Sequence, residues 1–313
     1  EWGRAGGRIP WAVCTRRYGE LREMGPGRRD RQRPYAGETT SACEALWYRA
    51  LLGRSFFDDP GGPQEYAYIP DDLLARLPLV EAPAAPPLGR PASAAERARL
   101  LPATDVLLDD ACTMLAGLRC GLSPDEIEPL LRCGRTAPAS PLTAAALIEL
   151  LKTAELINQH DEPIPEPTRL FLEAAPGQAL VMLFEAWLRS VVFNELRLAP
   201  GLVLEGQWKN DPLQTRQVVL DFLSTVPGSL KYDAAANERP FWSLGAFVSS
   251  VYQRHPDFQR PAGDYDSWYI RDAASGEFLR GFDHWDAVDG GLLRFFITGP
   301  LHWLGVLDLA GAE

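Results

Sequence analysis

Arginines are the residues of this sequence whose type and spacing could do chemistry. Seven of them lie between residues 16 and 33, on both sides of Gly25-Pro26-Gly27. Guanidinium groups on a flexible loop can neutralise the phosphates of a nucleic-acid backbone, so we expect this segment to contact DNA weakly and without reading its sequence. The candidate nucleic-acid-binding residues are Arg16, Arg17, Arg22, Arg28, Arg29, Arg31 and Arg33.

The helices that could enter a groove of DNA contain few residues that could recognise bases. The helix expected over 41–53 offers only Arg49, and the helix expected over 140–154 offers only Lys152. Base recognition in the major groove usually needs Arg, Lys, Asn or Gln near the start of a helix. We therefore expect contacts to the shape or backbone of nucleic acid.

Charge is distributed unevenly along the chain. Residues 1–54 contain eleven arginines and six carboxylates, a net charge of +5, although the whole chain carries −11. A basic segment on an acidic body can steer one face toward an anionic partner and repel that partner elsewhere. The alternative, a solvated arginine loop with no anionic partner, fits the same pattern.

Groups that could support catalysis are few. The acid–histidine group that could converge in the fold combines Asp264 and Asp266 with His284 and Asp286. A general acid–base pair needs a mutual geometry that spacing alone does not supply. The sequence has no GxxxxGKS or GxxxxGKT phosphate loop, no GxGxxG after a strand and no GxSxG nucleophile motif. We expect a protein that is not an enzyme, with an unrecognised hydrolase as the alternative.

The cysteines indicate neither a disulfide framework nor a metal site. Their number is odd, no CxxC occurs, and their intervals are not those of a zinc module. We expect no metal, no cofactor and a reducing cytoplasm. No apolar run approaches the roughly 18 residues of a membrane span. The sequence starts without Met, which predicts a piece of a longer chain. The five cysteines are Cys14, Cys43, Cys112, Cys120 and Cys133.

The elements that would position the arginines form a first domain, expected over 1–80. Ser41 and Glu44 have the spacing of a capping box, in which each side chain satisfies a free amide at a helix start. Strand-like segments at 54–58 and 64–69 flank a turn rich in Pro and Gly, which predicts a β-hairpin. Helices followed by a hairpin are the parts of a winged helix.

The rest of the chain predicts a linker and two more domains. Residues 81–103 are rich in Pro and Ala and predict the linker. A second winged-helix-like domain is expected over 104–176, with a candidate hairpin formed by 156–159 and 169–173. A third is expected over 177–313. Its helices are expected near 180–192, 211–226, 243–254 and 285–298, its hairpin over 268–271 and 277–280, and its last strand over 306–309.

Five stretches of the sequence resemble bacterial helicase-associated proteins, which carry a domain similar to the N-terminal region of XPB-type helicases. The resemblance covers most of the chain and implies tandem winged-helix units and an accessory role in DNA transactions beside a helicase. The stretches are RIPW at 8–11, EMGPGRRDR at 23–31, ALWYR at 45–49, EYAYIPDDLL at 65–74 and GPLHWLGVL at 299–307.

These observations predict a mainly α fold with small β-hairpins (α+β), arranged as tandem winged-helix-like domains. The expected function is a non-catalytic DNA-binding or helicase-accessory module that contacts nucleic-acid backbone through its basic N-terminal region. The alternative is a protein–protein interaction scaffold whose winged helices dock on a protein partner. We expect no membrane and no small-molecule substrate as partners.

Overall fold

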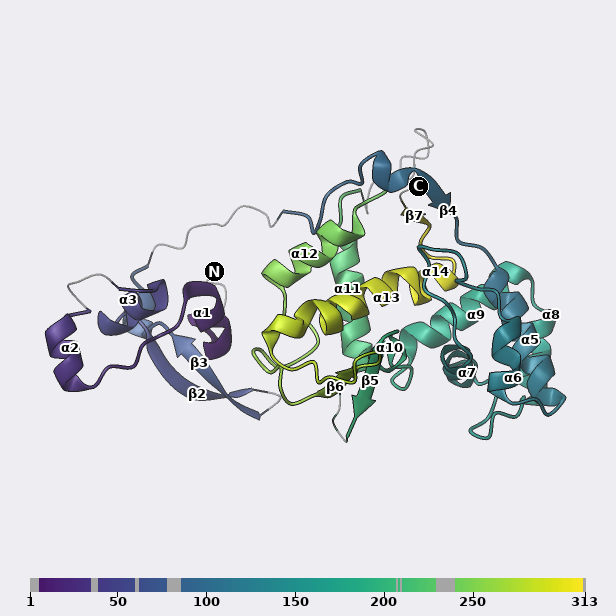
Figure 1. Cartoon of the computed structure of the whole chain (residues 1–313), viewed down its shortest axis with the longest axis horizontal. Coiled ribbons are helices and arrows are strands. Elements are labelled where there is room, and N and C mark those ends of the chain that lie inside the picture. Colours follow the sequence, from purple (N-terminus) through teal and green to yellow (C-terminus); the bar gives the residue numbers. More distant parts are fainter. Residues whose placement is uncertain are drawn as a thin grey trace. The chain divides into compact units, whose positions relative to one another are not determined.

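The structure, a computed structural model, describes residues 6–34, 39–59, 62–77, 86–206, 208, 210–228 and 240–311. About 47% of the chain is helical and 13% lies in strands, all in small antiparallel sheets, which confirms the mixed α+β class (Figure 1). The chain divides into two compact units. Unit 1 comprises Glu1–Pro86 with Arg260–Asp264, and unit 2 comprises Pro87–Gln259 with Tyr265–Glu313.

Unit 1 is a small three-stranded sheet with short helices, drawn in purple and blue in Figure 1. The strands pair in the order β1-β3-β2. The predicted hairpin is confirmed, with Phe56 opposite Glu65 in its register. The elements are β1 (Arg8–Pro10), α1 (Trp11–Tyr18), α2 (Pro26–Gln32), α3 (Ala42–Tyr48), β2 (Gly53–Asp59), β3 (Gly62–Tyr68) and α4 (Asp71–Leu74).

The core of unit 1 is small. Its buried side chains come from α1, α3 and the sheet, and Cys14 Sγ lies 3.9 Å from Cys43 Sγ within it. Burial raises the pKa of the Cys14 thiol to about 12, so the thiol stays protonated. A core of this size buries little apolar surface and stabilises the unit only marginally. The buried residues of this cluster are Ile9, Cys14, Cys43, Leu52 and Ala67.

Unit 2 is helical and has one continuous hydrophobic core. In Figure 1 the yellow helix α13 runs through the middle of this unit, and it packs against α10 and α12. The helices are α5 (Val106–Arg119), α6 (Pro124–Ile127), α7 (Ala144–Thr153), α8 (Pro165–Glu173), α9 (Pro176–Arg189), α10 (Glu195–Leu198), α11 (Pro212–Ser224), α12 (Leu244–Arg254), α13 (Gly291–Thr298) and α14 (Pro300–Trp303).

Two two-stranded sheets complete unit 2. Strand β4 (Arg99–Leu101) pairs with β7 (Leu309–Gly311), and β5 (Leu202–Glu205) pairs with β6 (Tyr269–Asp272). A π-helical turn, Asp286–Gly290, leads into α13. None of the helices in the described part of the chain is long and apolar enough to cross a membrane.

Helix starts in unit 2 follow from local sequence. Thr143, Asp211 and Ser243 precede α7, α11 and α12, and each side chain accepts a hydrogen bond from an amide of the first turn. The helix expected near 180–192 forms as α9 and buries Leu183 and Trp187 on one side, but it ends at Arg189, so Val191 and Val192 lie beyond it and are exposed. The capping side chains therefore fix where α7, α11 and α12 begin. The apolar side chains of α9 fix which side of that helix faces the core.

The hairpin predicted over 156–159 and 169–173 is wrong. Residues 169–173 belong to α8, which begins with Pro165 at its first position, where a missing amide costs nothing. Arg169 lies within 3.0 Å of Glu166 and of Glu173, spacings that only a helix brings together. The array of helices and hairpin expected for a second winged helix therefore does not form over 104–176.

The domain boundaries differ from the predicted ones. Residues 87–103 of the expected linker belong to unit 2, where β4 pairs with β7 and Pro91 forms a β-bridge with Trp242. Leu88 is buried in the same core. Leu147 and Trp187, expected in separate domains, also share this core, so 104–176 and 177–313 pack as one unit. Residues 81–85 lie outside the described residues.

Candidate nucleic-acid interface

The Gly-Pro-Gly segment forms a helix instead of the expected loop. Gly25 is the N-cap of α2, and Pro26 occupies the first helical position, where its missing amide costs no hydrogen bond. The helix ends at Arg33, whose φ of 44° is left-handed. No residue of α2 is buried, so the arginines are carried by an exposed, ordered turn of backbone.

The four arginines of this helix and its cap are all exposed. Because an α-helix turns about 100° per residue, Arg28 and Arg31 lie on one side of α2 and Arg29 on another, while Arg33 is the left-handed residue that follows the helix. Asp30 lies on the remaining side. Within the described residues, no carboxylate forms an ion pair with any of these four arginines. Arg31 Nε donates to the carbonyl oxygen of Gly27 at 3.0 Å, which leaves its charge unneutralised.

Arg22, also predicted to bind phosphate, has a structural partner. Its Nε and Nη2 donate to the two carboxylate oxygens of Glu44 at 2.9 and 2.6 Å, and the Glu44 side chain is fully buried. Hydrogen bonding to Arg22 holds the pKa of Glu44 below its ordinary value, and the Thr40 hydroxyl also donates to this carboxylate. Ser41 caps α3 as predicted, but the Glu44 carboxylate binds Arg22 instead of completing the box.

Arg16 and Arg17 lie in the last turn of α1, where positive charge complements the helix dipole. Arg16 is half-buried and Arg17 is exposed. The structure therefore gathers Arg28, Arg29 and Arg31 on α2, with Arg33 at its end. It places the other three predicted residues on α1 and in the segment before α2.

The hairpin and α3 add little positive charge to this surface. Arg54 on β2 lies 2.7 Å from Glu65 and stacks 4.5 Å over the ring of Trp11. Arg49, which ends α3, donates to the Ala45 carbonyl of its own helix at 2.9 Å. Asp58 near the tip of the hairpin is exposed. An acidic hairpin tip repels phosphates, so α2 is the element of unit 1 best suited to an anionic partner.

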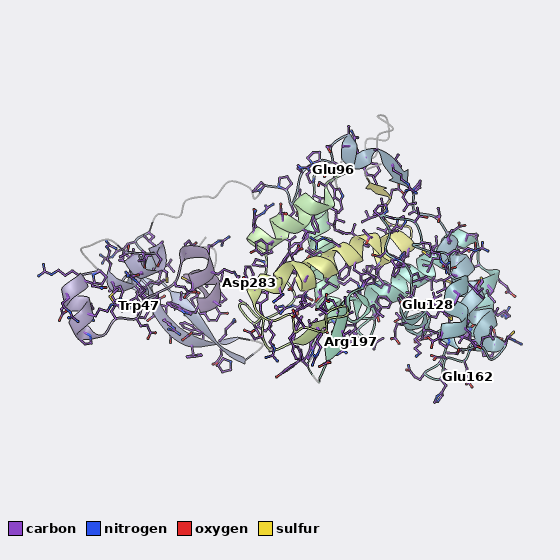
Figure 2. The ribbon with its side chains drawn as sticks, in the orientation of Figure 1. Trp47, Glu96, Glu128, Glu162, Arg197 and Asp283 are labelled. Carbon is purple, nitrogen blue, oxygen red and sulfur yellow. The ribbon has the colours of Figure 1, made fainter. Side chains whose placement is uncertain are left out.

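A hollow of about 650 Å³ lies between α2 and α3. Arg29 and Asp30 line it from α2, and Trp47 (labelled in Figure 2) lines it from α3. The Trp47 ring is half-buried and lies edge to face with Trp11, with 6.0 Å between centroids. A ring beside an arginine can hold a planar group, and no sequence pattern indicated this pairing.

A second hollow of about 960 Å³ lies in unit 2 and contains no activated nucleophile among its described lining residues. Ser243 Oγ donates to Glu96 Oε1 at 2.6 Å (Glu96 is labelled in Figure 2). Arg90 binds both oxygens of Glu96 and, with Ser243, keeps the pKa of that carboxyl far below its ordinary value. A carboxylate this weakly basic does not deprotonate a serine.

The acid–histidine group considered for catalysis includes residues of both units. Asp264 belongs to unit 1, and Asp266, His284 and Asp286 belong to unit 2, where Asp286 pairs with Arg294 at 2.7 Å. In the described part of the chain, no three His, Cys, Asp or Glu side chains are placed to hold a metal ion.

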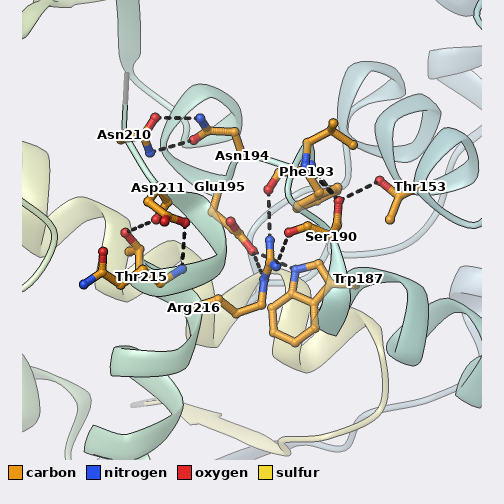
Figure 3. A network of polar contacts seen from close by, with 12 residues as sticks. Thr153, Trp187, Ser190, Phe193, Asn194, Glu195, Asn210, Asp211, Thr215 and Arg216 are labelled. Carbon is orange, nitrogen blue, oxygen red and sulfur yellow. Dashed lines mark hydrogen bonds and ion pairs between the residues drawn. The ribbon is translucent and has the colours of Figure 1, made fainter. Parts of the chain in front are cut away.

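The best-connected charged group of unit 2 is structural (Figure 3). Arg216 on α11 donates to Glu195 Oε1, to the Ser190 carbonyl and to the Phe193 carbonyl at 2.8–2.9 Å. Trp187 Nε1 donates to the same Glu195 oxygen at 2.8 Å. Both members of the ion pair are at most 2% exposed, so this group joins α9, α10 and α11 and cannot meet a ligand.

Comparison of the chain with protein-family models, with curated proteins and with solved structures found no match.

Proposed function

We propose that this chain is a non-catalytic accessory module of DNA transactions in the cytoplasm, which binds nucleic-acid backbone through helix α2 of unit 1. The resemblance to helicase-associated proteins suggests that it works beside a helicase. The order of unit 1, three helices followed by a hairpin with β1 added to the sheet, is compatible with a winged helix.

The observation that carries the proposal is the exposure of Arg28, Arg29, Arg31 and Arg33 without a carboxylate partner in the described structure. Elsewhere in the chain many arginines are neutralised, as in the pairs Arg54–Glu65 and Arg90–Glu96. Unpaired guanidinium groups bind phosphate at little cost because no existing ion pair must break. Their placement on different sides of α2 favours contact with several phosphates over reading of one base pair.

Salt dependence tests the proposal. Four phosphate contacts give a slope of about −3.6 in log K against log salt, so affinity falls roughly 100-fold between 50 and 200 mM salt. Fluorescence anisotropy with a labelled duplex measures both quantities. We expect the variant with Arg28, Arg29, Arg31 and Arg33 changed to Ala to lose most of the affinity and the slope.

A matched control removes the same charge from unit 2. Arg97, Arg119, Arg169 and Arg189 are exposed, and changing all four to Ala keeps α2 intact. We expect this variant to retain the slope of the unmodified protein. Absence of binding at 50 mM salt, or binding that survives the α2 changes, overturns the proposal.

Docking of a protein partner is the second candidate. Leu170 and Leu172 on α8 and Val181 on α9 are more than half exposed, which is unusual for three large apolar side chains on two helices in contact. If nucleic acid fails to bind at low salt, this candidate takes the place of the first.

A further inference from the structure

The outer face of the β5–β6 sheet in unit 2 carries aromatic rings and arginines. Side chains alternate along each strand, so Ile270 is buried while Tyr269 and Arg271 point to the other face. Val203 lies opposite Arg271 in the register and is 45% exposed. Phe278 extends this face through a β-bridge to Arg271. We call Val203, Tyr269, Arg271, Phe278 and Arg280 the ring face.

The arginines of the ring face lie over its rings, and Tyr269 and Phe278 meet edge to face with 6.3 Å between their centroids. The Arg280 guanidinium carbon lies 4.9 Å from the ring centroids of both Tyr269 and Phe278. The Arg271 guanidinium carbon lies 3.9 Å from that of Phe278. Tyr269 is 46% exposed and Phe278 is 36% exposed. The rings therefore meet solvent beside guanidinium groups that they hold in place.

Charge on the ring face is limited. Arg271 lies 3.0 Å from Glu205 and donates to the Gly276 carbonyl at 3.1 Å. Arg280 has no carboxylate partner among the described residues. The unpaired Arg280 guanidinium lies next to exposed rings. This arrangement suits a ligand whose flat, polarisable groups are linked by negatively charged groups. Duplex nucleic acid does not offer such groups, because its bases are stacked inside the helix.

We propose that the ring face binds unpaired bases of single-stranded nucleic acid. Bases stack on aromatic rings and on guanidinium planes, and this stacking tolerates any sequence because every base has a π face. A protein partner is the less favoured occupant, because Val203 and two rings already in contact with arginines leave little apolar surface to bury.

This inference rests on the proposed function, since α2 supplies most of the phosphate contacts, and it specifies which nucleic acid is bound. It also separates the contribution of the ring face to binding from that of the α2 arginines. Stacking releases few counterions, so the ring face adds affinity for single strands without changing the slope against salt. The arginines of α2 control that slope.

Anisotropy with a labelled oligothymidylate and a duplex of equal length, both at 50 mM salt, tests the inference. We expect tighter binding of the single strand. The double change Tyr269→Ala and Phe278→Ala should weaken single-strand binding about 10-fold or more and leave duplex binding and both salt slopes unchanged. Tyr269→Phe keeps the ring and should retain the preference.

A second variant covers the chance that the double change disturbs folding, which circular dichroism reports. Arg280→Glu changes an exposed side chain, opens no cavity and should also remove the preference. Equal binding of the two nucleic acids, or a preference that survives in the folded variants, overturns this inference while the proposed function stands. If neither nucleic acid binds the unmodified protein, both are overturned. If single-strand and duplex binding are lost in the α2 variant and in no other, the result supports the proposed function but contradicts this inference.

Discussion

Arg216 of unit 2 and the arginines of α2 in unit 1 carry the same chemical group in opposite settings. The Arg216 guanidinium is fully buried, bonded to one carboxylate and two carbonyls, and lies 4.9 Å from the ring centroid of Trp187. Arg28 and Arg29 on α2 are exposed and have no carboxylate partner in the described structure. Arg22 lies between these extremes, 39% exposed and paired with a buried Glu44.

Burial and hydrogen-bond partners therefore decide whether an arginine stabilises the fold or remains available to bind an anion. A buried guanidinium with a hydrogen bond from each of its nitrogens fixes the elements around it and is closed to a ligand. An exposed guanidinium contributes little to folding and keeps its donors for an anion. Substitution should therefore destabilise the protein most at Arg216, less at Arg22 and least at the α2 arginines.

The largest effect is expected for Arg216→Met. It leaves the Glu195 carboxylate buried without its cation and removes donors from two carbonyls, a loss of about 3–5 kcal/mol in the free energy of unfolding. Urea denaturation followed by circular dichroism measures it. The control is Arg189→Met, which breaks the exposed pair with Glu185 and should cost at most about 0.5 kcal/mol. Similar losses in both variants would contradict the comparison.

An intermediate effect is expected for Arg22→Ala. The buried Glu44 keeps only the hydrogen bonds from the hydroxyl and the backbone amide of Thr40, and we expect unit 1 to lose about 1–3 kcal/mol, measured by hydrogen exchange of α3 amides. Because Arg22 depresses the pKa of Glu44, the pair stabilises fully above the unfolded pKa of about 4.3. The stabilisation is lost as pH falls through the lower, folded pKa.

The difference between Arg22→Ala and the unmodified protein should therefore be large at neutral pH and shrink as the pH falls below about 4. Arg49→Ala is a suitable control, because Arg49 is exposed and donates a hydrogen bond to the Ala45 carbonyl of its own helix. A difference that stays constant from pH 7 to pH 3 would show that the ion pair does not act through Glu44.

Sequence reasoning succeeded where the signal is local. The hairpin of β2 and β3 follows from a Pro- and Gly-rich turn between alternating segments, and the start of α3 follows from Ser41. It failed where the segments that contact one another are far apart in the sequence. Strand β5 is short and finds its partner β6 far along the chain, so no local pattern indicates it. Pro165 lies between the two segments of the hairpin expected over 156–159 and 169–173, but proline is also favoured at the first position of a helix, and there it begins α8.

The candidate site shows the same division. The richness in arginine between residues 16 and 33 is visible in the sequence, but the partner of Arg22 lies 22 residues away, and only the fold shows that this arginine is engaged. The hairpin expected over 268–271 and 277–280 brings the rings and arginines of the ring face together, but only the fold shows that they share an exposed face. Residue type can nominate such groups, while exposure and pairing decide which of them can bind.

The smallest effect on stability is expected for the α2 variant with Arg28, Arg29, Arg31 and Arg33 changed to Ala. None of these side chains is buried or ion-paired within the described residues, and alanine is the best helix former, so the free energy of unfolding should change by at most about 0.5 kcal/mol. Relief of repulsion among four like charges acts in the same direction as helix propensity. Hydrogen exchange of α1 and α3 amides, compared with that of Arg22→Ala, measures the change in unit 1. A loss comparable to that of Arg22→Ala would mean that the α2 arginines hold unit 1 together, and the contrast with Arg216 would then not separate folding from binding.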